Sequence, residues 1–504
     1  IESLNVLKGL AATVLYGDQG RNGVILVTTK SGKGKKNAEI TVQQTFNITE
    51  VASLPKFQNN WGVGFQGLYG AFFSNWGPSF SEIDSVGHPY QFLGSAVLRD
   101  AYPEYFFNRI KYDAGQDISK FFRKGLASNT YVNFSGGNDK IGYNASTSYT
   151  KEQGFVLGND VTRLNLSLGI NASITKKLTI QNNILLSVTG VETPPLNAAT
   201  GGGASLNGIP SLYGQFLYTP RSLDLFDWPS ATRDNRSIYY RGGNDIANPL
   251  WVAKNYRELN NTTRVFNSTT LTYDISEHLN FSYRVGYDTY TEGQERRFNK
   301  GGTQGPNIIN GAYQTQTIRN TIFNQDFIVG YNKQLTQDFN LTARVGFNAR
   351  NDRFNRDGLY SEGQAIEGLF KHYNFATASS RGIGFSDTPA NARILNRETE
   401  EQRMGVYGDF SLDYKQYLFL NLAGRNDWTS TLEATNNNIF YPSVSASFIP
   451  TEAFGGLKSS TLSYLKFRVG YGTSAGFAPF PYGTRSVASL NARGYFDFAP
   501  NTVN

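Results

Sequence analysis

Hydrophobic and polar residues alternate in many segments of this chain. Between residues 161 and 190, Leu164 and Leu166 are each followed by a polar residue, and the alternation continues until a polar turn at residues 171–177. A second alternating run then covers residues 178–188. Successive side chains of a β-strand point to opposite faces, so this period of two predicts an antiparallel hairpin with one apolar and one polar face.

About thirteen segments of the chain show this alternation and are predicted to be strands. They cover residues 39–49, 129–135, 141–150, the two halves of the hairpin at 161–190, and then 262–273, 279–291, 317–331, 339–350, 404–414, 417–425, 440–448 and 464–472.

The connections between these strands are sorted by length. Short turns alternate with longer segments, which are residues 50–128, 151–160, 191–261, 292–316, 351–403 and 426–439. In an up-and-down meander every second connection lies at the same end of the sheet, so we expect all the longer segments on one rim. This is the layout of an all-β transmembrane antiparallel barrel of the outer-membrane kind, with short periplasmic turns and long extracellular loops.

The predicted strand faces agree with a barrel wall. Arg284, Arg344 and Arg468 fall on the face opposite to the apolar residues of their strands. An arginine facing lipid at the bilayer midplane costs about 2–4 kcal/mol, so we expect the polar faces to line a wet or plugged lumen. Aromatic residues near strand ends, such as Tyr287 and Tyr414, are typical of the aromatic girdles at membrane interfaces.

Composition excludes several other classes of protein. A formal net charge of +7 over 504 residues is too mild to indicate a nucleic-acid partner. The absence of cysteine excludes a disulfide framework and a thiolate metal site. No run of about eighteen apolar residues is present to cross a bilayer as a helix. There is no signal peptide and the chain begins inside an apparent strand, which predicts a piece of a longer precursor.

The first thirty residues have a different pattern, predicted as strand, short helix, glycine-rich turn and strand. The helical turn is expected within residues 11–16, and the second strand within residues 24–29. The spacing of Gly17, Gly20 and Gly23 superficially resembles a phosphate-binding loop. A dinucleotide motif leaves a strand and opens a helix, whereas these glycines follow a helix and open a strand. We interpret them as turn residues that permit positive φ.

The stretch IESLNVLKGLAATVLYGDQGRNGVILVTTKSGK closely resembles the end of the plug domain in SusC/RagA-like TonB-dependent outer-membrane transporters. Weaker resemblances to barrel strands of that family occur at YPSVSASFIPTEAF, residues 441–454, and LKFRVGYGTSAG, residues 465–476. The match departs from the family at Gly9, Leu10, Asp18 and Gln19. The residues interpreted as a structural plug motif are Tyr16, Gly17, Gly20, Asn22 and Gly23.

The resemblance implies a domain division, a cellular location and partners. Residues 1–37 would be the C-terminal part of the plug and its linker, and residues 38–504 the N-terminal part of a barrel of about 22 strands when complete. It implies a multi-pass protein in the lipid bilayer of the bacterial outer membrane, energised by TonB through a segment that precedes Ile1. It also implies a SusD-like surface lipoprotein as a lid, often in a dimer of such pairs, and a cargo of oligosaccharides or peptides.

The sequence offers no catalytic constellation, so we predict no enzyme activity, no cofactor and no metal. His88, His278 and His372 are scattered and are expected at the surface. The long loops are instead rich in aromatic residues, whose faces can stack on sugars or pack on a partner. The candidate cargo or lid contacts are Trp61, Phe65, Tyr69, Trp76, Tyr213, Trp228, Tyr239, Tyr240 and Trp251.

Three alternatives stay open at this point. The aromatic residues could fold the loops themselves instead of binding anything. A passive channel is a second possibility, which the plug-like segment argues against. A third is a structural barrel subunit of a larger outer-membrane or secretion assembly, without import activity.

Overall fold

The computed structural model describes twelve separate parts of the chain. These are residues 3–7, 16–28, 37–70, 74–194, 212, 216–217, 219–241, 243, 247–303, 309–379 and 395–473, together with 476–477. Three predictions fall partly or wholly outside them, namely the helical residues 11–15, most of the linker at 31–37, and Tyr213.

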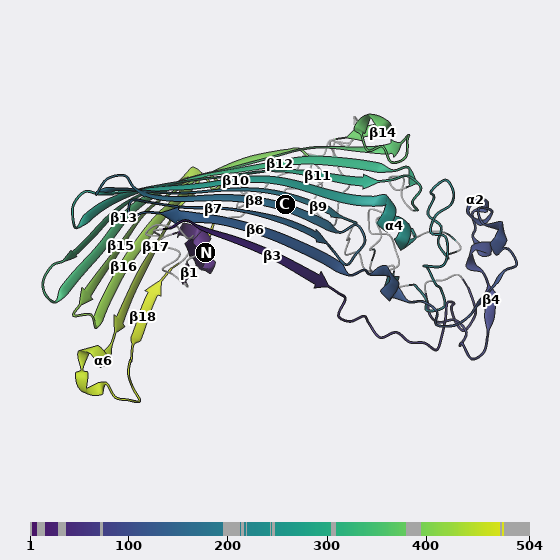
Figure 1. Cartoon of the computed structure of the whole chain (residues 1–504), viewed down its shortest axis with the longest axis horizontal. Helices are drawn as coiled ribbons and strands as arrows, with labels where there is room; N and C mark the ends of the chain where they lie inside the picture. Colours follow the sequence, from purple (N-terminus) through teal and green to yellow (C-terminus); the bar gives the residue numbers. More distant parts are fainter. Residues whose placement is uncertain are drawn as a thin grey trace.

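One large, curved antiparallel sheet dominates the structure (Figure 1). The described residues form thirteen strands along its main path, as the alternation predicts, and each strand pairs with its neighbour in the chain. The strands are β3 (Glu39–Thr49), β6 (Gly125–Gly137), β7 (Ile141–Gln153), β8 (Asp160–Ser173), β9 (Leu178–Thr193), β10 (Tyr256–Asp274), β11 (Leu279–Phe298), β12 (Ala312–Gln334), β13 (Phe339–Gln364), β15 (Arg397–Tyr414), β16 (Leu418–Thr429), β17 (Asn438–Phe448) and β18 (Phe467–Gly472). A short strand, β14 (Phe375–Ser379), pairs with β13 off this path.

Several strands are much longer than predicted. β13 has 26 residues and reaches Gln364, although the alternation predicts its end at Arg350. Its outer half, which includes Arg353 and Asn355, is polar on both faces, so the hydrophobic period ends before the hydrogen-bonded ladder does. A tilted strand needs only about 9–11 residues to cross a bilayer, so these strands are longer than such a crossing would require.

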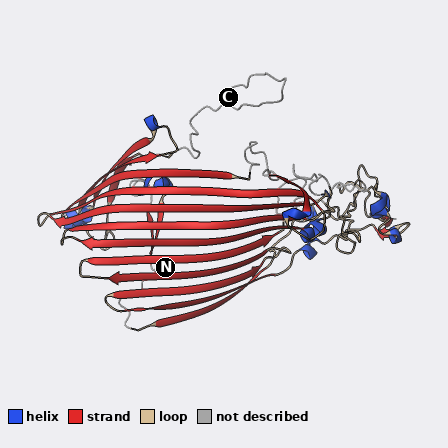
Figure 2. Ribbon diagram, turned by 90° about the horizontal axis from the view of Figure 1, so that it is seen from above, coloured by secondary structure: helices blue, strands red, loops and turns tan. Residues whose placement is uncertain are grey.

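The connections are sorted by length over most of the sheet. The short turns, residues 138–140, 174–177, 275–278, 335–338 and 415–417, lie at one end of the strands. The loops and helices gather at the other end, as Figure 2 shows. The prediction of strict alternation is wrong at the last hairpin, because residues 449–466 at the short-turn end contain α6 (Pro450–Ala453) and η8 (Gly455–Leu457), and β18 begins at Phe467 instead of Tyr464.

The plug-like segment lies on the concave side of the sheet (Figure 1). β1 (Ser3–Leu7) pairs antiparallel with β2 (Val24–Thr28), and a 3₁₀ helix, η1 (Gly17–Asn22), immediately precedes β2. The two predicted strands are therefore confirmed, whereas the predicted helix lies almost wholly outside the described residues, and the 3₁₀ helix occupies the stretch predicted as a glycine-rich turn.

In the parts of the chain that are described, no helix has both the length and the apolar character needed to cross a membrane.

Candidate functional site

Two long loops that are far apart in the sequence fold together beyond the ends of the strands. The backbone N–H of Val63 donates to the hydroxyl oxygen of Ser222 at 2.9 Å, in a buried position. The Tyr90 hydroxyl donates to the Pro229 carbonyl at 2.8 Å. Lys120 and Asp224 form an ion pair at 3.3 Å. We call this unit, residues 50–124 together with the described parts of 212–255, the loop domain.

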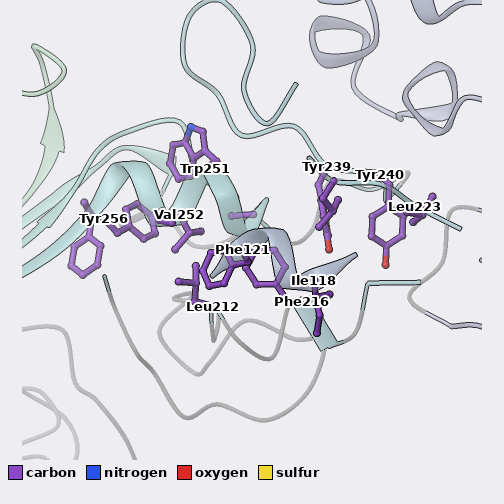
Figure 3. Close-up of a cluster of buried hydrophobic side chains, with 14 of the residues drawn as sticks. Ile118, Phe121, Leu212, Phe216, Leu223, Tyr239, Tyr240, Trp251, Val252 and Tyr256 are labelled. Atoms are coloured by element: carbon purple, nitrogen blue, oxygen red, sulfur yellow. The ribbon is translucent and has the colours of Figure 1, made fainter. Parts of the chain in front are cut away.

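An apolar core holds the loop domain together (Figure 3). Its helix α4 (Pro249–Asn255) begins at a helix cap, because the Asn248 side chain accepts a hydrogen bond from the Leu250 N–H and Pro249 supplies a fixed φ at the first helical position. The largest fully buried side chains of this core are Tyr112, Leu212, Phe216, Leu223, Tyr239, Tyr240, Trp251 and Tyr256, and Phe298 joins them from β11.

The candidate contact residues divide into a buried group and an exposed group. Tyr239, Tyr240 and Trp251 are each only 1% exposed, so in this structure they build the core of the loop domain. Tyr69 and Trp228 are partly buried against the same core. For these five side chains the structure has the arrangement expected if aromatic residues fold the loops themselves.

Trp61, Phe65 and Trp76 are instead exposed at the surface of the loop domain. The rings of Phe65 and Trp76 meet edge to face, with centroids 4.9 Å apart. A tight turn between Phe65 and Leu68 contains Gly67 at φ +78°, a conformation that glycine adopts without steric cost. We call Trp61, Phe65 and Trp76 the exposed aromatic group; it can offer ring faces to a sugar or a protein.

The prediction that His88 lies at the surface is wrong, because its side chain is fully buried in the loop domain. Its ring stacks on Tyr105 at 3.9 Å and lies 4.5 Å from Trp228. Its Nδ1 accepts a hydrogen bond from the Tyr90 N–H, and burial lowers the pKa of His88 to about 4. The ring is therefore neutral at pH 7. Among the described residues, no group of three His, Asp or Glu side chains is placed to hold a metal ion.

A polar cavity of about 900 Å³ lies between the plug-like segment and the concave face of the sheet. Tyr16, Gly23 and Val24 line it from the plug-like side. From the wall it is lined by two aspartates, many Asn, Ser and Thr side chains, and five arginines: Arg284, Arg344, Arg350, Arg403 and Arg425. The prediction that arginines face the lumen, made for Arg284 and Arg344, therefore agrees with the structure.

The plug motif residues surround the turn at η1. Gly17 and Gly23 have φ values of +70° and +96°, as expected for turn glycines. Gly17 and Gly20 are buried, whereas Tyr16 and Asn22 are exposed.

Comparisons with known proteins agree with these observations. No family model matches the chain. TonB-dependent receptor P3 of Formosa agariphila is 24% identical over 496 residues, which cover 96% of this chain and 43% of that protein. TonB-dependent receptor SusC of Bacteroides thetaiotaomicron is 24% identical over 175 residues, 34% of this chain and 14% of SusC. The structure of the RagAB peptide transporter matches with a TM-score of 0.74 at 16% identity, over 99% of this chain and 54% of that one.

The chain is therefore similar in sequence to TonB-dependent receptors, SusC among them, and similar in fold to the RagAB transporter. It spans less than half the length of the Formosa receptors that it matches, 43% of receptor P3 and 44% of receptor P26. The relatives are named as receptors and transporters, and none of those described above is named as an enzyme.

The residues that join the two loops of this chain could not be predicted from its sequence. Ser222 and Val63 are 159 positions apart, and neither lies in a periodic segment or a motif. The sequence also did not predict a buried ion pair on β16, Arg425 with Asp427. The alternation predicts a strand that ends at Arg425 and assigns Asp427 to a long connection, whereas β16 continues to Thr429.

Proposed function

We propose that the chain is part of an outer-membrane active importer that takes oligosaccharides or peptides into the periplasm. The observation that carries this proposal is the position of the plug-like segment. It lies on the concave, arginine-lined side of the sheet, against a cavity of about 900 Å³, while the loop domain stands at the far ends of the strands. A wall, an internal obstruction and an outer capture surface are the parts that gated uptake requires.

TonB would supply the energy for this import, because the outer membrane holds no ATP. A pull on the plug would open the lumen, and the arginines and amides along the wall would provide a polar route for a hydrated cargo. Collapsing the inner-membrane proton gradient distinguishes this mechanism from a passive channel, since only TonB-driven uptake depends on that gradient.

A SusD-like surface lipoprotein would close over the loop domain as a lid, and two such pairs would form a dimer. The exposed aromatic group supports this part of the proposal, because it leaves three large rings in solvent on the outer surface. Exposed aromatic side chains of this kind are enriched at protein interfaces and sugar sites. Tyr69, Trp228, Tyr239, Tyr240 and Trp251 would act indirectly, by holding that surface in shape.

The test has two measurements on the full-length protein. The first is purification from detergent-solubilised outer membranes, with co-purifying chains and bound small molecules identified by mass spectrometry. The second is uptake of the identified cargo with and without a protonophore. A stoichiometric SusD-like lipoprotein, a bound oligosaccharide or peptide, and uptake abolished by the protonophore would support import. A large assembly with neither lid nor cargo would favour the structural-subunit alternative.

A further inference from the structure

A buried, charged cluster lies on the lumen face of β16. The Arg425 Nε donates to the Asp427 carboxylate at 2.6 Å, and the two side chains are only 4% and 5% exposed. Tyr407 and Tyr441 flank Arg425 on the neighbouring strands. The guanidinium lies over the Tyr407 ring, 5.2 Å from its centroid, and the Tyr441 hydroxyl donates to the Asp427 carboxylate.

Arg425 and Asp427 are much more buried than some other arginines that line the same cavity. Arg284 and Arg344 also project from the concave face, and both are exposed. The difference comes from what covers the Arg425 and Asp427 side chains. An ion pair that is removed from water remains favourable only when it has close partners on every side. The residues that cover it must therefore occupy one specific position.

Two glycines enclose the pair. A Cβ atom on Gly17, in the plug-like segment, would lie 2.9 Å from the Asp427 Oδ2 and 3.1 Å from the Arg425 Nη2. A Cβ atom on Gly405, the register partner of Asp427 on β15, would overlap the same carboxylate and guanidinium. Both glycines therefore allow a backbone to approach the ion pair more closely than any other residue could.

We propose that the Arg425–Asp427 pair is a fixed anchor for the Tyr16–Gly17 turn, which holds this end of the plug-like segment on the barrel wall. The anchor limits which parts of the plug-like segment can move. Movement that opens the lumen must occur in parts of the plug other than this turn, because the turn stays bound at β16. The term plug rests on the proposed function, whereas the contact between Gly17 and the ion pair does not.

Replacement of Gly17 tests the anchor. In G17A the added methyl group meets the ion pair and the residue keeps a strained positive φ, so the turn is displaced from β16. The matched control is G368A in an outer loop, because Gly368 has nearly the same φ, +75°, and nothing lies within 4 Å of a Cβ atom there. The two variants share the backbone strain and differ only in the contact.

The readout is the conductance of the purified full-length protein in planar bilayers, with no TonB and no cargo present. We expect large open events to be about tenfold more frequent in G17A than in wild type, which corresponds to about 1.4 kcal/mol, and unchanged in G368A. D427N, which keeps the side-chain shape and removes the charge, should open the barrel as G17A does. If G17A is not recovered folded, D427N carries the test.

Equal conductance of wild type, D427N and any folded G17A would overturn the anchor. An equal rise in G17A and G368A would overturn it as well, since strain alone would then explain the result. Failure of the proposed import is separable from both outcomes. Suppose that the wild type is closed and that G17A and D427N are open, but that the protein imports nothing. This result would support the anchor and contradict the import proposal.

Discussion

The indole N–H of Trp251 donates a hydrogen bond to the backbone carbonyl of Asn235 at 2.9 Å. Asn235 has a φ of +57°, so the bond fixes a strained turn against helix α4. Trp251 is thus an internal support of the loop domain, and its polar edge has no capacity left for a ligand.

Replacing Trp251 by Ala should destabilise the loop domain by about 3–5 kcal/mol, because the change leaves a large cavity and an unpaired carbonyl. Hydrogen exchange of the loop-domain amides measures this local effect without unfolding the barrel. W61A is the matched control, since Trp61 is 48% exposed and its loss should change stability by less than about 0.5 kcal/mol. Equal protection in W251A and W61A would contradict the assignment of Trp251 to the core.

Acidification should loosen the loop domain through His88. Burial lowers its folded pKa from the ordinary value of 6.5 to about 4, so the neutral ring is favoured in the folded state. The stabilisation is fully present above pH 6.5 and is lost as the pH falls from 6.5 to 4, where the total amounts to about 3 kcal/mol. Hydrogen exchange of residues 85–110 as a function of pH should follow this window.

The control for His88 is a variant that cannot titrate. In H88F the acid-dependent loss of protection should disappear, whereas H278F, at an exposed turn, should keep the wild-type profile. A wild-type profile in H88F would assign the pH dependence to another group.

Removing the Ser222 hydroxyl should weaken the contact between the two loops. In S222A the buried N–H of Val63 loses its acceptor, a cost of about 1–3 kcal/mol. Exchange of the Val63 amide should therefore accelerate. S74A removes a comparable acceptor, for the Trp76 N–H, but at an exposed site within one loop, so its effect should be small. Slow exchange at Val63 in S222A would show that other contacts dock the loops.

The two faces of β13 should respond oppositely to a new charge. Val345 is 51% exposed on the outer face, whereas Thr342 lines the cavity on the concave face. In the proposed outer-membrane barrel, V345R should cost up to about 2–4 kcal/mol, and T342R should cost little. The measurement is the folded fraction in lipid vesicles, read from heat-modifiable migration on gels. Equal folding of both variants would contradict the assignment of the outer face to lipid.

The alternation of residues such as Leu164 and Leu166 was enough to predict the sheet, its strand count and its order, because a half-apolar wall repeats the same signal in every strand. It could not predict the outer half of β13. Arg353 and Asn355 on one face and Asp352 and Arg356 on the other are all polar, so no period of two distinguishes a strand from a loop there.

The loop domain was less predictable for a different reason. Composition indicated that its aromatic residues matter, but exposed Trp76 and buried Trp251 have similar local sequences, both rich in Asn, Pro or apolar neighbours. Their environments are decided by contacts across more than 100 positions, such as Val63 with Ser222. The position of His88 depends on Trp228 in the same way.

The unusual length of β11, β12 and β13 determines how far the sheet extends. At about 3.3 Å per residue, the 26 residues of β13 extend roughly 85 Å along the strand, more than twice the length of the roughly 9–11 residues that a tilted strand needs to cross a bilayer. β11, β12 and β13 form one continuous hydrogen-bonded ladder over this length, and Phe298, the last residue of β11, packs into the core of the loop domain. Under the proposed function, this ladder would hold the base of the loop domain in place before a partner docks, which would lower the entropy cost of binding.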